Sequence, residues 1–455
     1  MATAAVAEGA DQALINTLAN GVRVVALPMP HLASASVSVF VRAGSAHESR
    51  ALNGISHVVE HMVFKGTASR DARAINLDAE RLGARVDAHT DKDHTAFHLQ
   101  GLAAHAGRFV QLLGDIVQQP SFPADEFERE RAVLLHEYTE DEDDPMAAAY
   151  RLFDRACWGL HPLAQPVIGS RANVQRFTRD DLLAHVQRHY CGANVIVAAA
   201  GAIDPEALLR EAESVFGALP RGAPSTVTAP VYRGGLRAQR LGGSSQVHVV
   251  LGLPVPPLSA RDPAAQVAAT LFGEGMSSPL MAQVRERQGL VYYAACAADL
   301  LETGGQFVVE ASTAPAQLAD FVTTVARLLT EQAASIDAVD LERAHNQLLV
   351  RLLRAHEKPT RRLEEAALDL FVHGRLRSRA ERADEISGVD AAQVRNAFAT
   401  MLGAELSLAV TGAVARGTRE RLRELLAGSG LRLGEESAPE ATSGAGPARR
   451  LDLND

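Results

Sequence analysis

A strand–turn–helix unit occurs once in each half of the chain and constrains its fold more than any other sequence feature. In the first half, residues 95–101 (Thr-Ala-Phe-His-Leu-Gln-Gly) precede an amphipathic segment that begins at Ala104. In the second half, residues 305–311 (Gly-Gln-Phe-Val-Val-Glu-Ala) precede a segment of similar length that begins at Pro315. This recurrence indicates an internal duplication. Because strands mixed with runs of helices favour α+β over a doubly wound parallel sheet, we expect two homologous α+β domains, each a mostly antiparallel sheet packed with helices.

Two stretches of unusual composition suggest where these domains end. The chain has 455 residues, which is too long for one hydrophobic core. Residues 220–235 hold three prolines and several glycines, so they are predicted to form a linker. Residues 428–455 are rich in Gly, Ser, Ala, Glu and Pro and lack apolar periodicity, so they are predicted to form a disordered tail. The predicted domains are therefore residues 1–219 and 236–427.

The composition excludes several classes of function. A formal net charge of −10 argues against a nucleic-acid binder, which would need a basic face. No apolar run is long enough to cross a bilayer, so no membrane partner is expected. The first residues lack the basic start and apolar stretch of a secretory signal, and we therefore expect a cytoplasmic protein. Three widely spaced cysteines predict neither a disulfide framework nor a thiolate metal site.

A short apolar segment carries the residues that indicate chemistry. Residues 55–64 lie between two glycines and are predicted to form a short buried helix, which holds His57, Glu60 and His61. Residues four apart share a helix face, so both imidazoles can reach one ion. Glu60 lies on nearly the same face and can take a proton from a metal-bound water. This order is the reverse of the better-known His-Glu-x-x-His motif, and it predicts a zinc peptidase.

A catalytic zinc site needs a third protein ligand. The segment that begins near Pro123 has Phe127, Glu130, Leu134 and Glu137 at helical spacings. Glu137 is therefore a candidate ligand, and Glu130, two turns earlier, is a candidate supporting group. The alternative is that both glutamates belong to a charged helix face and point into solvent.

Longer stretches of the chain resemble the pitrilysin (inverzincin) family of metallopeptidases, in particular its compact bacterial branch, which is akin to the mitochondrial processing peptidase β subunit. The matching segments in the first half are residues 44–48, 54–67, 128–137 and 161–163, Gly169 and residues 177–181. The resemblance implies that His57, His61 and Glu137 bind one zinc ion per chain. It also implies that Glu60 is the base, that Glu130 assists, and that the fold is half of a clamshell.

The second half matches the same family. Residues 275–278 and 285–292 are similar to its C-terminal signature, in which an arginine and a tyrosine reach the active site from the opposite domain. The resemblance therefore implies catalytic roles for Arg285 and Tyr292, in holding substrate and in stabilising an oxyanion. Two chains are needed to close a chamber, so we expect a homodimer, or a heterodimer with a related subunit.

Three positions depart from the family pattern. Asp87 replaces the usual Asn in the strand that seats the peptide, and this change points to basic side chains in the substrate. His136 stands beside the candidate ligand where Glu or Arg is usual, and Pro279 stands where an arginine is common. None of these changes removes a catalytic group.

Four further histidines form a loose second set, namely His89, His94, His98 and His105. If residues 94–98 form a strand, His94 and His98 share a face, which would allow a second metal site. Solvated or edge-strand histidines are the favoured interpretation.

The sequence as a whole predicts a zinc endopeptidase that cleaves peptides or unfolded segments inside a closed chamber by means of a metal-activated water. One alternative is a dedicated processing peptidase for a single precursor peptide. The other is a non-catalytic structural subunit of the same fold, which the metal residues argue against.

Overall fold

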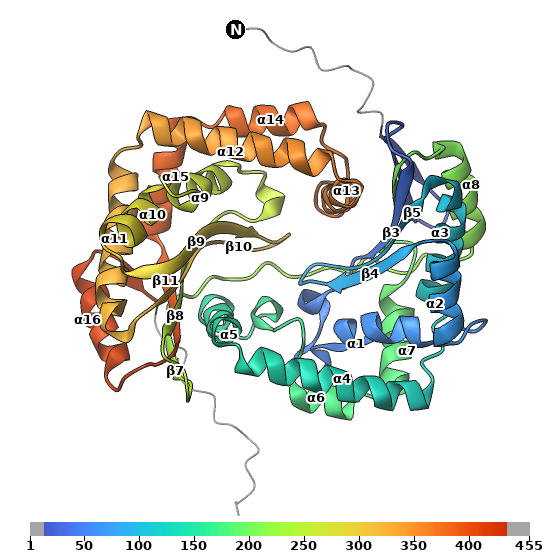
Figure 1. The fold of residues 1–455 in the computed structure, drawn as a ribbon, viewed down its shortest axis with the longest axis horizontal. Coiled ribbons are helices and arrows are strands. Elements are labelled where there is room, and N and C mark those ends of the chain that lie inside the picture. Colours follow the sequence, from blue (N-terminus) through green and yellow to red (C-terminus); the bar gives the residue numbers. More distant parts are fainter. Residues whose placement is uncertain (1–12, 435–455) are drawn as a thin grey trace, which may run out of the picture.

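The computed structural model describes residues 13–434 and contains two sheets, each backed by helices (Figure 1). The first sheet has the strand order β1-β2-β6-β3-β5-β4. Its strands are β1 (Leu14–Thr17), β2 (Arg23–Pro28), β3 (Ser34–Val41), β4 (Arg85–Thr90), β5 (Thr95–Leu102) and β6 (Val195–Gly201). The helices of this half are α1 (Ile55–Met62), α2 (Ala72–Arg81), α3 (Ala106–Gln118), α4 (Ala124–Asp143), α5 (Pro145–Trp158), α6 (Arg171–Arg176), α7 (Arg179–His189) and α8 (Pro205–Phe216).

The second sheet has the order β12-β11-β8-β10-β9, with β7 also paired to β11. Its strands are β7 (Gly235–Arg240), β8 (Val247–Pro254), β9 (Val291–Leu300), β10 (Gly305–Thr313), β11 (Glu405–Gly412) and β12 (Arg432–Leu433). The helices of this half are α9 (Ala264–Gly273), α10 (Pro279–Met281) with a π-helical turn (Ala282–Arg287), α11 (Leu318–Ala334), α12 (Ala338–His356), α13 (Pro359–His373), α14 (Arg379–Ser387), α15 (Ala391–Gly403) and α16 (Thr418–Gly428).

The two sheets repeat one topology. Five strands of the first sheet run in the order β2-β6-β3-β5-β4, and five of the second run in the corresponding order β7-β11-β8-β10-β9. The β2–β6 and β7–β11 pairs are parallel, while the other pairs among these strands are antiparallel. The predicted α+β fold of two domains with mostly antiparallel sheets is therefore confirmed, and the shared topology supports the duplication.

Each half lends one helix to the sheet of the other half (Figure 1). Helix α13, from the second half, packs on β6 and β3 through an apolar face that includes Leu363, Ala367 and Leu370. Helix α5, from the first half, packs on β11 and β8 and inserts Phe153. A Cβ atom at Gly252 in β8 would lie 2.5 Å from the Phe153 ring, so only glycine fits beneath it. Because the central strands are covered on both faces, every residue of β6 is buried.

The end of the fold differs from the prediction. The predicted tail began at residue 428, yet Leu431 is 4% exposed in the second core, and β12 pairs in parallel with β11. Two alternating leucines in four residues are too short a pattern to be recognised as a strand from sequence. The fold therefore includes residues 428–434, since Gly428 is the last residue of α16, and the rest of the predicted tail lies outside the described residues.

The region predicted as a linker forms no helix or strand between residues 220 and 234. It is nevertheless held against the domains, since the Tyr232 hydroxyl donates to the Gly252 carbonyl oxygen at 3.1 Å and the Ser225 amide donates to Asn194 Oδ1 at 2.7 Å. Among residues 13–434, no helix combines the length and the apolar character that a bilayer crossing requires.

Candidate active site

Helix α1 is anchored at its N-terminus by a buried carboxylate. Glu48 is 4% exposed and accepts hydrogen bonds from the backbone amides of Gly54 at 2.7 Å and Ser56 at 2.8 Å. The Glu48 oxygens satisfy backbone amides that would otherwise be unpaired at the start of the helix. A carboxylate at this end also interacts favourably with the helix dipole. Gly54 itself has φ +98°, and a Cβ atom there would lie 2.8 Å from the Gly169 Cα atom. These contacts fix the start of α1, and the sequence analysis assigned no role to Glu48.

Helix α1 and helix α4 bring the three predicted zinc ligands together. The Oε2 atom of Glu137 lies 3.9 Å from His57 Nε2 and 3.6 Å from His61 Nε2. The two imidazole rings are 4.6 Å apart, and one possible ligand atom from each residue lies within 4.8 Å of the others. Ligands placed about 2.0–2.2 Å from a shared tetrahedral zinc ion are separated by about 3.4 Å. The donor set and its spacing therefore fit zinc.

Glu130 lies behind this cluster and orients one of its histidines. Its carboxylate accepts from His61 Nδ1 at 2.9 Å and pairs with Lys65 Nζ at 2.7 Å. Burial would raise the pKa of Glu130, but the hydrogen bonds from His61 and Lys65 hold it below its usual value. An ionised Glu130 keeps the His61 proton on Nδ1, so Nε2 presents its lone pair to Glu137. The alternative in which Glu130 faces solvent is wrong, because the residue is only 7% exposed.

The pKa values of the two histidines shift in opposite directions. Burial, together with the nearby His61, lowers the pKa of His57 to about 4, so this ring is neutral at physiological pH and available as a ligand. Burial opposes protonation of His61 as well, but the contacts with Glu130, Glu137 and Glu60 raise its pKa overall.

Glu60 occupies the position expected of a general base. Burial raises its pKa, and the hydrogen bond donated by Thr90 Oγ1 at 2.7 Å acts in the opposite direction. Glu60 lines a hollow of about 390 Å³ together with His57, Glu137 and residues 166–168. A carboxylate with a raised pKa beside the candidate ligands can both accept and return a proton. Thr90 and Lys65 are supporting residues that the sequence analysis did not identify.

Arg285 and Tyr292 lie in the other half of the chain. The Arg285 guanidinium sits 5.5 Å from the centre of the Tyr292 ring, and Tyr292, in β9, is 83% exposed. Within residues 13–434, no hydrogen bond, ion pair or ring contact joins this pair to His57, His61 or Glu137. One chain thus presents the pair on its surface, apart from the metal cluster.

The three departures from the family pattern leave the cluster intact. The Asp87 side chain is 61% exposed in β4, and the His136 side chain is 75% exposed beside Glu140 on α4. Pro279 begins α10, where a missing amide proton costs nothing.

Comparison with known proteins decides the family. Residues 23–171 match the insulinase family (peptidase family M16), and residues 176–348 match the peptidase M16 inactive domain. An uncharacterized zinc protease of Mycobacterium tuberculosis is 32% identical over 403 residues, which cover 87% of this chain and 92% of that protein. The chain belongs to peptidase family M16. The resemblance to the pitrilysin family is therefore confirmed.

Other relatives span equally large parts of the M16 chain. An uncharacterized zinc protease of Rickettsia felis is 28% identical over 88% of this chain and 97% of its own length. Among solved structures, a protease from Helicobacter pylori has a TM-score of 0.81 at 21% identity, covering 88% of this chain and 99% of that one. A peptidase M16 inactive domain from Pseudomonas fluorescens has a TM-score of 0.80 at 20% identity, covering 89% and 99%. These two likenesses establish the fold.

In the second half of the chain, the helix that corresponds to α1 carries no candidate metal ligand. Helix α9 follows β8 as α1 follows β3, but its sequence, AAQVAATLFG, has no titratable side chain. The candidate ligands on α1, His57 and His61, therefore have no counterpart on α9.

Proposed function

We propose that this chain is a zinc endopeptidase that holds one catalytic zinc ion through His57, His61 and Glu137. The observation that carries the proposal is the convergence of these three side chains beside a partly buried glutamate, Glu60. When bound, zinc would supply a Lewis acid that polarises a peptide carbonyl and lowers the pKa of its water. Three protein ligands leave the fourth tetrahedral position open for that chemistry.

Glu60 moves the proton in this scheme. Its carboxylate, oriented by Thr90, takes a proton from the attacking water and returns it to the leaving amine. The raised pKa of Glu60 makes its carboxylate a stronger base for the first transfer, and a shift toward neutral pH suits a group that must both accept and return a proton. Glu130 supports the site by fixing the ring of His61.

Strand β4 is the proposed seat of the substrate. Among residues 13–434 it pairs only with β5, which leaves its other edge unpaired by these residues beside the hollow that Glu60 lines. A peptide can add to such an edge as a further strand. The exposed carboxylate of Asp87 on β4 favours basic side chains in that peptide. Only extended or unfolded segments can pair in this way, which supports peptides as the substrate class.

Two chains would complete the active site. Tyr292 is exposed and Arg285 is partly exposed, and they contact each other, so a second chain could bring its metal cluster to this pair. A two-fold homodimer is the simplest closed arrangement, and a heterodimer with a related subunit would serve equally. In either arrangement the first half of one chain, with the candidate zinc ligands, would face the second half of the other chain, with Arg285 and Tyr292, across a chamber.

A zinc titration with variants of one helix tests the assignment of the ligands. Glu137→Gln is expected to lose tight zinc binding at this site, because the amide is a poorer ligand than the carboxylate. Glu130→Gln is expected to bind zinc about 10–100-fold more weakly, since it removes only the partner of His61. The measurement is the zinc dissociation constant by competition with a chelator.

His136→Gln is the matched control for this titration. It changes the side chain next to Glu137 on the same helix, but that side chain is 75% exposed, so zinc affinity should be unchanged. Wild-type affinity in Glu137→Gln would refute the proposed ligand set.

A further inference from the structure

A second group of metal-ligand side chains lies on the β4–β5 hairpin, where α13 of the other half covers it. His89 is the last residue but one of β4, His94 lies in the turn, and His98 lies in β5. Glu364 of α13 projects among them. His105, the fourth member of the set suggested by the sequence, lies in a 3₁₀ turn (Ala103–His105) and is not part of this group.

Strand alternation explains why these histidines meet. In the β4–β5 register, Asp87 is opposite His98 and His89 is opposite Ala96. His89 and His98 therefore share the face on which α13 packs. Thr90, the next residue, points to the opposite face and donates to Glu60. One hairpin thus carries this histidine group on one face and a support of the catalytic base on the other.

The ligand atoms converge on the Glu364 carboxylate. Its Oε1 atom lies 3.6 Å from His89 Nε2 and 3.4 Å from His98 Nε2, and its Oε2 atom lies 3.4 Å from His94 Nε2. Possible ligand atoms of His89, His94 and Glu364 all lie within 4.8 Å of one another. This spacing is close to that of the candidate catalytic site.

The Nδ1 atoms of His98 and His94, which point away from Glu364, each lie close to an oxygen atom of another side chain. Ser38 Oγ lies 2.7 Å from His98 Nδ1, and Asp91 Oδ2 lies 3.2 Å from His94 Nδ1. A proton held on Nδ1 in each ring leaves Nε2 with a lone pair directed at the group's centre. Histidine ligands of metals are commonly held by such a second hydrogen bond.

His94 is the observation that favours an ion over a simple hydrogen-bonded group. It is 2% exposed, packed between Phe40 and Phe371, and neither of its ring nitrogens makes a hydrogen bond of good geometry. Its polar contacts are with two carboxylates, Asp91 at 3.2 Å and Glu364 at 3.4 Å, and a buried imidazole whose nitrogens are not well hydrogen-bonded is costly.

His98 Nε2 also lies 3.3 Å from His89 Nδ1. A proton on His94 and a hydrogen bond donated by His89 Nδ1 to His98 Nε2 would still leave His89 Nε2 facing Glu364 without a proton, whereas a metal ion would join all three rings to the carboxylate.

We propose that His89, His94, His98 and Glu364 form a second metal site that takes zinc or another divalent transition ion. His89, His94 and Glu364 provide three ligand atoms within reach of one ion. His98, whose Nε2 lies 3.4 Å from Glu364 Oε1, would supply the fourth ligand and so the closed arrangement of a structural zinc site. Imidazole-rich sites select transition metals over calcium or magnesium. The ion would tie the β4–β5 hairpin of the first half to α13 of the second half, and so stabilise the strand that carries Thr90.

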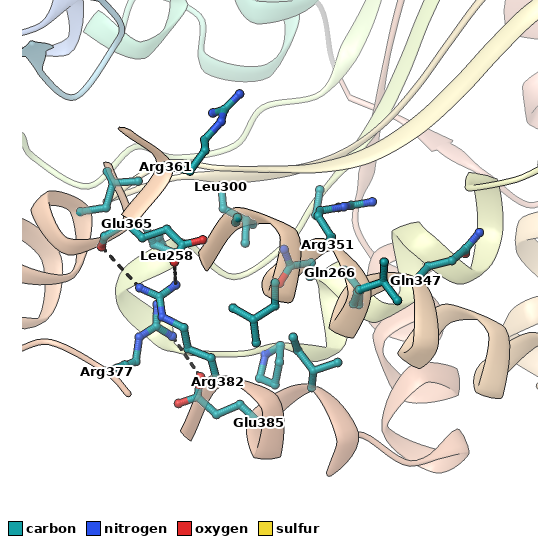
Figure 2. A pocket seen from close by; sticks show the side chains of 18 of the residues that line it. Leu258, Gln266, Leu300, Gln347, Arg351, Arg361, Glu365, Arg377, Arg382 and Glu385 are labelled. Carbon is teal, nitrogen blue, oxygen red and sulfur yellow. Dashed lines mark hydrogen bonds and ion pairs between the residues drawn. The ribbon is translucent and has the colours of Figure 1, made fainter. Parts of the chain in front are cut away.

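Glu364 also lines a cavity of about 1240 Å³ between α12, α13 and α14. Figure 2 shows this cavity, with Arg361 and Glu365 of α13 among the labelled residues. The neighbouring Glu365 faces Arg382 at 3.8 Å and not the histidines. This difference between adjacent glutamates provides a matched control.

The test is the number of zinc ions bound per chain. The purified full-length protein is loaded with zinc, freed of excess by gel filtration, and measured by elemental analysis. We expect about two zinc ions in the wild type and in Glu365→Gln, and about one in Glu364→Gln, in His98→Gln and in His61→Ala. Ser38→Ala should retain the site but weaken its zinc binding by about 10–100-fold.

The outcomes separate this inference from the proposed function. If the wild type binds one zinc ion, and Glu364→Gln and His98→Gln also bind one, the second site is overturned. If the wild type binds one zinc ion that is kept in His61→Ala but lost in Glu364→Gln and His98→Gln, the result supports the second site and contradicts the catalytic one. Thermal unfolding checks that each variant is folded, and His98→Gln keeps the test decisive if Glu364→Gln does not fold.

Discussion

Glu60→Gln is expected to bind zinc at the His57–His61–Glu137 site as the wild type does and to cleave peptides about 10³-fold more slowly. The substitution preserves the size of the side chain and the hydrogen bond from Thr90, while removing the basic oxygen. No ligand is lost, so the effect should fall on turnover and not on metal content. The measurements are kcat on a peptide substrate and zinc per chain on the same sample.

Glu128→Gln is the control for this loss of activity. Its side chain, on α4, is 69% exposed and pairs only with Arg131 in a local contact. Surface changes of this kind usually have small effects, so its activity should equal that of the wild type. Full activity in Glu60→Gln would show that another group is the base.

Mixing two impaired variants is expected to restore activity from near zero to about a quarter of the wild-type value. One variant is Glu60→Gln, which lacks the base, and the other is Tyr292→Phe, which lacks the hydroxyl proposed to stabilise the oxyanion. If the two halves meet across a homodimer, each mixed dimer contains one site with both groups intact. Random pairing makes about half of the dimers mixed, and one site in two is then active.

The mixing experiment also distinguishes the competing arrangement. If Tyr292 reached the metal cluster of its own chain, every site would keep one defect and no activity would return. Tyr292→Phe mixed with wild type under the same exchange conditions controls for the exchange itself. A fully active monomer in sedimentation would exclude the two-chain chamber altogether.

Local features of the site could be predicted from the sequence. His57, Glu60 and His61 lie within five residues, so helix geometry alone brings them together. Glu137 could be proposed from helical spacing on a second segment, but the sequence left open whether that face was buried. The structure closes this question for Glu130, which is buried against His61 and Lys65.

Contacts between the halves could not be predicted in this way. The apolar positions of α13, Leu363, Ala367 and Leu370, predict that it packs on a sheet but not on which one. The chain crosses over so that α13 covers the first sheet and α5 covers the second. The second histidine group depends on that crossing, because Glu364 lies more than 250 residues after the histidines it meets.

The zinc dependence of peptide cleavage is the most direct test of the proposed function. The measurement is the rate at which the full-length protein cleaves a mixed peptide library as purified, after removal of metal by a chelator, and after zinc is restored. Cleavage should disappear with the metal and return with zinc. Cleavage that continues unchanged without metal, or no cleavage by the zinc-loaded protein, would contradict the assignment of a zinc endopeptidase.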